Sequence, residues 1–164
     1  MQEIIVRSAQ ECDLPALCDI LNEIITIGGS TAYEGVFDPQ TFDAAFVSGE
    51  LCVECLVALV NGIPMGFQAV AHYPSLPGDW LDIGTFARVS GKVKGVGTSL
   101  FSHMAALLAG RGISYINASI RSDNHQGLAF YSKMGFEDYA LDKAIAVAKG
   151  LPIDRISKKY RLKS

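Results

Sequence analysis

The pair Asn61-Gly62 constrains the fold of this chain more than any other two neighbouring residues. The pair lies between two apolar runs, residues 52–60 and 64–71, that have the length and character of strands. Asn-Gly adopts the positive φ angles of a two-residue hairpin turn, so the sequence predicts two neighbouring antiparallel strands. The expected fold is therefore built around a sheet.

Helical and strand patterns follow one another along the rest of the chain. Residues 14–25 place apolar side chains at helical spacing, with Asp13 as the expected N-cap, Pro15 in the first turn and Gly28 after the end. Further strands are expected at residues 4–8, 80–88, 113–120, from 136 and at 153–162, and further helices from 38, from about 97 to 108 and over 124–133. This order predicts one α/β (α+β) domain, residues 1–164, around a single mixed sheet.

Composition excludes several classes of protein. Of the 164 residues, 49% are hydrophobic and 19% charged, which predicts a packed core rather than long disordered regions. The formal net charge of −3 and the lack of a Lys/Arg run give no electrostatic reason to expect nucleic acid or a membrane as partner. No secretory signal is visible after Met1, and apolar runs such as 56–60 are too short to span a bilayer, so we expect a cytoplasmic location.

Four cysteines, Cys12, Cys18, Cys52 and Cys55, raise the question of a metal or redox site. Cys52 and Cys55 form a CxxC motif, but no second ligand pair has the spacing of a zinc site. A redox motif would open a helix after a strand, whereas this one opens an expected strand. We therefore predict buried, reduced and structurally passive cysteines, and no metal.

A glycine-rich turn between a predicted strand and a predicted helix carries the first functional motif. It reads Lys92-Val-Lys-Gly95-Val-Gly97-Thr-Ser. Two glycines let a ligand approach the backbone closely, and the start of a helix offers unpaired N–H groups with a favourable dipole. Lys92 and Lys94 add positive charge. The turn is suited to bind a diphosphate.

Two better-known phosphate motifs do not match this turn. The dinucleotide fingerprint requires a third glycine where the chain has Leu100, and the P-loop requires a lysine between Gly97 and the following hydroxyl residue. An ordinary glycine-rich strand–helix turn remains the alternative for this segment taken alone.

A second segment, Asn124-His-Gln-Gly-Leu-Ala-Phe-Tyr-Ser-Lys-Met-Gly-Phe136, follows the next predicted strand. Together the two segments resemble the GNAT acyl-CoA N-acyltransferase superfamily. Its signatures are Arg/Gln-x-x-Gly-x-Gly/Ala and Asn-x-x-Ala-x-x-Leu-Tyr-x-x-x-Gly-Phe, and their order and separation also fit. The chain departs from them with Lys92, Gly127 and Phe130 where the family has Arg or Gln, alanine and leucine.

The resemblance implies a fold and a cofactor. The GNAT fold has a central mixed, mostly antiparallel sheet of six to seven strands, about four flanking helices and a cleft where two central strands splay apart. Acetyl-CoA would be the cosubstrate, with its pyrophosphate on the backbone of residues 92–98 and its pantetheine arm between strands 80–88 and 113–120. The residues implied in cofactor binding are Phe86, Ala87, Arg88, Lys92, Val93, Lys94, Gly95, Val96, Gly97, Thr98, Ser99, Asn124 and Tyr131.

Acetyl transfer to an amine needs a base for the ammonium proton, and an acid helps the thiolate to leave. Tyr131 matches the family tyrosine that lies near the thioester sulfur, with a core-filling tyrosine as the alternative. Asp82 stands where the phosphinothricin acetyltransferase branch has a glutamate, and a solvated strand-end carboxylate is the equal alternative. Glu34 is a further candidate base, which could instead hold the substrate ammonium.

The same resemblance implies an acceptor site and an activity. The residues implied in substrate binding are Tyr33, Glu34, His72 and Arg88, where Arg88 would suit a carboxylate. We expect an N-acetyltransferase that transfers directly, in a ternary complex, to a small amino acid-like amine of the phosphinothricin or methionine sulfoximine type. The alternatives are a peptide or protein N-acetyltransferase and a non-catalytic acyl-CoA sensor. Members of this branch commonly form homodimers, which we also expect here.

Overall fold

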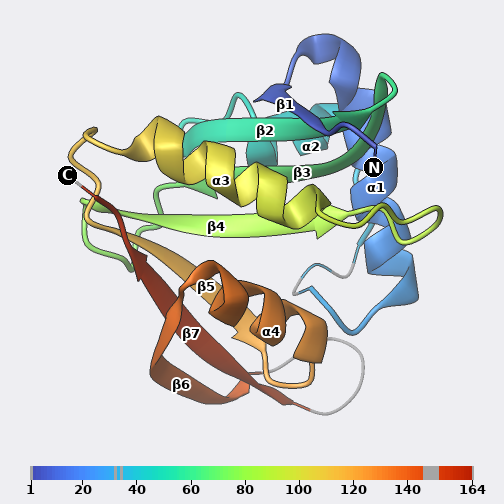
Figure 1. The fold of residues 1–164 in the computed structure, drawn as a ribbon. Coiled ribbons are helices and arrows are strands. Elements are labelled where there is room, and N and C mark those ends of the chain that lie inside the picture. Colours follow the sequence, from blue (N-terminus) through green and yellow to red (C-terminus); the bar gives the residue numbers. More distant parts are fainter. Residues whose placement is uncertain (1, 32, 34, 146–151, 164) are drawn as a thin grey trace.

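The computed structural model describes residues 2–31, 33, 35–145 and 152–163. Seven strands and four α-helices follow one another along these residues (Figure 1). Their bounds are β1 Ile5–Ser8, α1 Leu14–Ile27, α2 Pro39–Phe46, β2 Cys52–Val60, β3 Ile63–Ala71, β4 Trp80–Ala87, α3 Val96–Leu108, β5 Tyr115–Arg121, α4 His125–Met134, β6 Glu137–Ile145 and β7 Ile153–Arg161. The expected elements are confirmed, with boundaries within about two residues.

All seven strands form one sheet in the order β1-β2-β3-β4-β5-β7-β6. The pair β4–β5 is parallel and every other neighbouring pair is antiparallel. The β2–β3 hairpin turns at Asn61-Gly62, where both residues have positive φ angles of 51° and 75°. The mixed, mostly antiparallel sheet predicted for this chain is confirmed.

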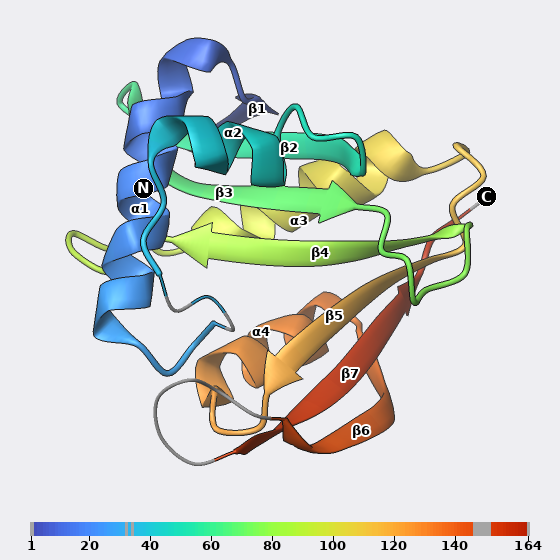
Figure 2. The same cartoon turned by 180° about the vertical axis from the view of Figure 1, so that it is seen from behind.

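The helices cover the two faces of the sheet unequally. Helices α3 and α4 lie on one face and α1 and α2 on the other, so that two apolar clusters form (Figures 1 and 2). Strand β2 contributes to both clusters, because its side chains alternate between the faces: Leu56 packs under α3 and Val57 under α1. Among the described residues, no helix covers the face of β5 and β7 opposite α4 (Figure 2).

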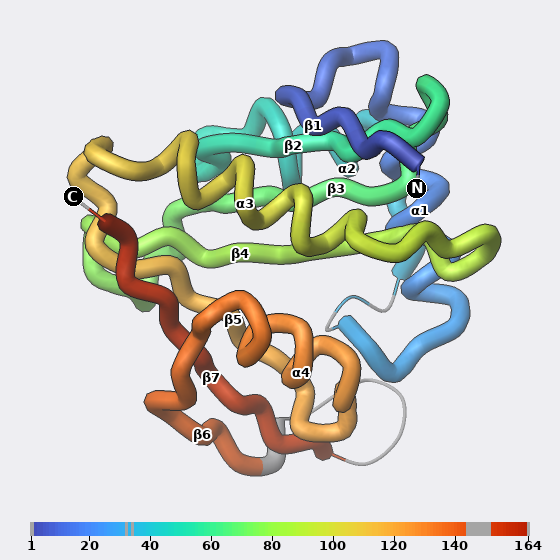
Figure 3. Tube along the Cα trace, viewed as in Figure 1, coloured from blue at the N-terminus to red at the C-terminus, as the bar shows by residue number. Residues whose placement is uncertain are grey.

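The central strands β4 and β5 separate along their length. They pair only at Trp80–Tyr115, Leu81–Ile116 and Asp82–Asn117. Beyond Asp82, β4 continues to Ala87 beside β3 alone, and β5 continues beside β7 (Figure 3). The sheet therefore opens in its middle, and no strand of the described chain pairs with the backbone of β4 beyond Asp82 on that side.

One local prediction is wrong in its detail. Asp13 precedes α1, but its carboxylate makes no capping bond to the helix. It accepts two hydrogen bonds from Arg7, at 2.7 and 3.0 Å, and one from the backbone N–H of Gln10. The ion pair with the end of β1 has outcompeted the cap, and it lowers the pKa of Asp13.

The cysteines also differ in part from the prediction. All four are free thiols, but only Cys18 and Cys55 are buried, whereas Cys12 is exposed. Burial raises the pKa of Cys55 to about 12, so this thiol is protonated and inert at neutral pH. Among the described residues, no helix is long and apolar enough to cross a membrane.

Candidate active site

A large cleft follows the opening between β4 and β5. Its volume is about 1810 Å³, above the range of about 300–1,000 Å³ that suits one drug-sized ligand. One end reaches the turn before α3, and the other reaches the open polar face of β5 and β7. A cleft of this size and shape can hold two substrates that meet between the strands.

The turn before α3 forms the first end of the cleft. Gly95 is the N-cap with φ of +94°, and no side chain caps the helix. The first intrahelical bond runs from the N–H of Ser99 to the carbonyl of Gly95, so the N–H groups of Val96, Gly97 and Thr98 lack helical acceptors. Lys92 and Lys94 are exposed beside them. The start of α3 therefore offers N–H donors without helical acceptors, and their binding of a diphosphate stays a prediction.

Not every residue predicted in this region lines the cleft. The cleft wall includes Phe86, Ala87 and Arg88 from the end of β4 and residues 92–98 from the turn. Ser99 is outside that wall, and its N–H is already used within the helix.

Glu23 of α1 holds the segment that leads into this turn, a contact that sequence reasoning missed. Its carboxylate accepts hydrogen bonds from the N–H of Val89 at 3.0 Å and from the hydroxyl of Ser90 at 2.6 Å. These bonds lower the pKa of Glu23, so the carboxylate stays ionised. The first helix thereby fixes where the turn before α3 begins.

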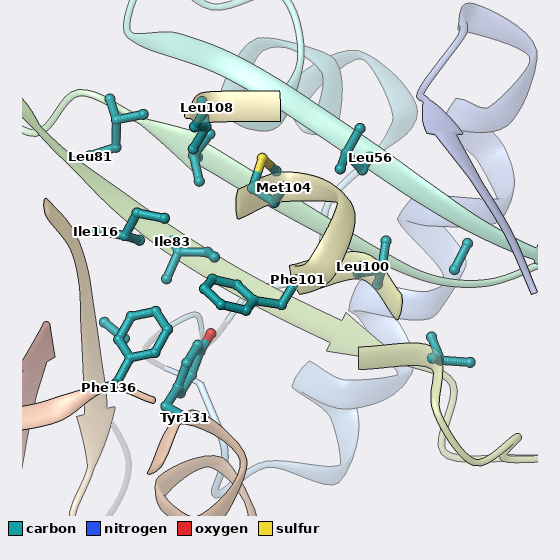
Figure 4. Packing of buried hydrophobic residues seen from close by; sticks show 14 of the residues in the cluster. Leu56, Leu81, Ile83, Leu100, Phe101, Met104, Leu108, Ile116, Tyr131 and Phe136 are labelled. Carbon is teal, nitrogen blue, oxygen red and sulfur yellow. The ribbon is translucent and has the colours of Figure 1, made fainter. Parts of the chain in front are cut away.

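Tyr131 lies at the middle of the cleft. Figure 4 shows its ring beside Phe136, with its oxygen directed toward β4. The hydroxyl donates to Thr85 at 2.9 Å, and Gln68 donates to the same threonine oxygen at 2.9 Å. Burial raises the pKa of Tyr131, and the charge of Asp82 raises it further. The phenol is therefore protonated at neutral pH, and in this structure its hydrogen is directed to Thr85.

Asp82 belongs to a polar network on the other face of the sheet. Asn117 of β5 donates to its carboxylate at 2.8 Å, and Tyr139 of β6 donates to the amide oxygen of Asn117. Burial raises the pKa of Asp82, although the bond from Asn117 and the positive charge of Arg155 oppose this. Asp82 is therefore not the solvated strand-end carboxylate of the alternative interpretation.

Two of the predicted acceptor residues, Tyr33 and His72, line the cleft. The ring of Tyr33 packs against Phe37 and Phe46. Burial raises the pKa of its hydroxyl, and the charge of Asp82 raises it further. His72 is exposed at the end of β3 and lines the cleft. Glu34 lies outside the residues that the structure describes.

Two other predicted side chains are already engaged by the protein. Arg88 follows β4 near the turn before α3, and its Nε donates to the carbonyl of Pro64 at 2.7 Å. Asn124 caps α4 by accepting from the N–H of Gly127 at 3.0 Å, and its Nδ2 reaches the carbonyl of Ser30 at 3.3 Å. Both line the cleft, with part of their hydrogen-bonding capacity taken up.

Sequence reasoning missed the polar residues of β5 and β7. Asn117 and Ser119 alternate with the buried Ile116, Ala118 and Ile120, so they point into the cleft from a central strand. Polar residues at every second position of an otherwise apolar central strand were the available signal. In the described part of the chain, no group of three or more His, Cys, Asp or Glu side chains is placed to hold a metal ion.

Comparison with known proteins identifies the family. The sequence model of the acetyltransferase (GNAT) family matches residues 15–136, which include every element that lines the cleft except β6 and β7. The chain belongs to the acetyltransferase (GNAT) family. It is accordingly an acetyltransferase, and GNAT enzymes use acetyl-CoA as the acetyl donor. A search of curated proteins found no match.

Solved structures agree with this GNAT fold. The chain superposes with a TM-score of 0.87 on yncA, a putative acetyltransferase from Salmonella typhimurium with its cofactor acetyl-CoA, at 20% identity over 98% of this chain and 95% of that one. A putative phosphinothricin N-acetyltransferase gives 0.84 at 22% identity over 99% and 100%. A ribosomal-protein-alanine N-acetyltransferase from Brucella melitensis gives 0.83 at 20% over 96% and 99%. At these identities the likeness concerns the fold.

Proposed function

We propose that this GNAT acetyltransferase moves the acetyl group of acetyl-CoA to the primary amine of a small amino acid-like molecule, by direct transfer in a ternary complex. The observation that carries the proposal is the two-ended cleft. A backbone anion site lies at one end, a mostly buried carboxylate lies toward the other, and Tyr131 lies between them. Two similar structures are described as phosphinothricin acetyltransferases, which supports the class of acceptor.

The residues of the anion end fit the CoA diphosphate. The uncapped N–H groups at the start of α3 and the exposed lysines at 92 and 94 provide hydrogen bonds and positive charge. The free edge of β4 beyond Asp82 offers backbone groups to an extended amide chain such as the pantetheine arm. When bound, acetyl-CoA supplies a thioester whose carbonyl carbon accepts an amine nitrogen.

Asp82 is proposed as the base. An alkylammonium group titrates near ~10 and must lose a proton before its nitrogen can attack. The raised pKa of Asp82 makes this carboxylate a stronger base than an ordinary aspartate, and Asn117 fixes its orientation. Glu34 stays an alternative base or ammonium ligand.

Tyr131 is proposed as the acid. As the new C–N bond forms and the C–S bond breaks, the departing sulfur needs a proton or a hydrogen-bond donor. The Tyr131 phenol keeps its proton at neutral pH because burial raises its pKa. Asp82 and Tyr131 lie on opposite faces of the sheet and interact electrostatically through the opening between β4 and β5. Asp82 would therefore accept the amine proton from one face, and Tyr131 would donate to the sulfur from the other.

A direct assay tests this function. Purified protein with acetyl-CoA and a panel of amino acids and simple amines should release CoA thiol with at least one small amine, and mass spectrometry should find the N-acetyl product. Acetylation of peptides alone would favour a peptide or protein N-acetyltransferase. Binding of acetyl-CoA without turnover on any amine or peptide would favour the sensor and contradict the proposal. We further propose one domain that pairs as a homodimer, which sedimentation equilibrium tests.

A further inference from the structure

Arg155 of β7 is a cation in the acceptor end of the cleft to which neither motif pointed. In the strand register it lies opposite Arg121 of β5 and Asp142 of β6. Its side chain lines the cleft on the polar face of β5 and β7. Its Nε donates to the hydroxyl of Ser119 at 3.0 Å, and its Nη2 donates to the carbonyl of Ser119 at 2.7 Å. These two bonds fix the plane of the guanidinium against β5.

The charge of Arg155 has no carboxylate partner at ion-pair distance among the described residues. The neighbouring Arg121 is paired with Asp123 at 3.0 Å, whereas within the described part of the chain the Arg155 guanidinium donates its hydrogen bonds to the neutral Ser119. Arg155 is partly buried, and burial lowers its pKa. The charges of Asp82 and Asp142 partly offset this effect, but neither carboxylate contacts the guanidinium. A partly desolvated cation without a contacting anion costs stability, and an anion that arrives with the ligand would remove that cost. A guanidinium has five N–H donors, so several remain for a planar anion.

The position of Arg155 relative to Asp82 defines what the ligand must look like. Asp82 is held by Asn117, and Arg155 is held by Ser119, two residues further along the same face of β5. Two residues of an extended strand span about 6.8 Å. An α-amino acid with a hydrogen bond of about 2.8 Å at each end covers a distance of this order. A negative group and a positive group at this spacing complement a zwitterion.

We propose that Arg155 is the acceptor-carboxylate site of this enzyme, so that the substrate is an α-amino acid bound with its amine toward Asp82 and its carboxylate on Arg155. This inference rests on the proposed function and deepens it. Arg88 does not compete for the role, because it lies at the diphosphate end of β4 and its Nε is bound to Pro64. The Arg155 charge also disfavours a bare alkylammonium ion, which brings a second positive charge into the same end of the cleft.

The test compares acids with their amides. Wild type, Arg155→Gln and Arg155→Lys are assayed for kcat/KM with L-methionine sulfoximine, L-methionine and L-leucine, each beside its carboxamide. Arg161→Gln is the matched control, because Arg161 is an exposed arginine on the same strand, outside the cleft. For the best acid, Arg155→Gln should lower kcat/KM about 10- to 100-fold, while its amide changes less than threefold. Arg155→Lys should retain part of the preference, and Arg161→Gln should match wild type.

The outcomes separate the two proposals. If wild type turns over amides or simple amines as well as acids, or if Arg155→Gln lowers both equally, the carboxylate site is wrong and the acetyltransferase function stands. If wild type acetylates no amine at all, both proposals fail. Melting temperatures of the variants show whether a loss reflects unfolding, and the charge-conserving lysine variant keeps the test valid if the glutamine variant is unstable.

Discussion

Gly95 offers the sharpest test of the anion end of the cleft. Its φ of +94° lies in the region that disfavours a side chain, yet a Cβ there would have room, since its nearest neighbour is Ile4 Cδ1 at 3.5 Å. Gly95→Ala therefore introduces backbone strain without a clash. An L-residue in the left-handed region costs about 1–2 kcal/mol. This turn can relax in the unliganded protein and must return to its original shape to bind a diphosphate.

The strain sets the expected magnitudes. If the turn relaxes fully in the absence of ligand, CoA must restore the strained conformation when it binds. The strain of about 1–2 kcal/mol then weakens binding and raises the Kd for CoA about 5- to 30-fold. If it does not relax, the same energy lowers the melting temperature by about 2–8 °C, since 1 kcal/mol corresponds to about 2–4 °C in a chain of this length. Both effects come from the same strain. The free energy lost in CoA binding and the free energy lost in stability should therefore add up to about 1–2 kcal/mol.

Gly112 provides the matched control. Its φ is +80°, nothing lies within 4 Å of its expected Cβ, and it is outside the cleft. Gly112→Ala should lose stability by the same amount and bind CoA as wild type does. Calorimetric titration of CoA and thermal melting of both variants provide the comparison. Equal CoA affinity in Gly95→Ala and wild type, together with an unchanged melting temperature, would refute the assignment of strain to this turn.

Three further predictions concern single groups. Tyr131→Phe should lower kcat about 100-fold and leave the Kd for CoA within threefold, as measured by thiol release and calorimetry; an unchanged kcat would exclude the acid role. In wild type, kcat/KM should rise with pH as Asp82 ionises. The pH profile of Asp82→Asn should lack this rise. Because the folded pKa of Asp82 is raised, its ionisation costs stability as pH rises above the ordinary carboxyl range, so Asp82→Asn should melt above wild type at pH 8. For Asp13 the effect on stability is reversed, because its lowered pKa means that the ionised carboxylate stabilises the fold. Asp13→Asn should melt several degrees below wild type at pH 7, and this difference should shrink as pH falls toward 3.

The sequence predicted the fold well because its signals are local. Asn61-Gly62, the helical spacing after Asp13 and the turn at 91–97 each determine a structure within a few residues. The order of strands in the sheet is not local, and it was available only through the resemblance to a family. The failed cap at Asp13 shows the same limit, because its competing partner, Arg7, comes from β1.

The candidate site likewise contains residues that local motifs predict and residues that only the sheet brings together. Gly95 and Tyr131 lie in contiguous motifs, and both line the cleft, although their roles stay predictions. Thr85, Asn117 and Arg155 come from three different strands, and only the sheet brings them to one cleft. No spacing in the sequence encodes that proximity. Polar residues that alternate within buried strands are the one pattern that points to such positions in advance.

The central claim is that backbone N–H groups at the start of α3 bind the diphosphate of CoA. The measurement that tests it most directly is a titration of ¹⁵N-labelled protein with CoA, followed by amide NMR. The account predicts that the largest shifts fall on the amides of Val96, Gly97 and Thr98, and that 4′-phosphopantetheine shifts them less. Saturation with CoA that leaves these three amides unchanged, while others move, would contradict it.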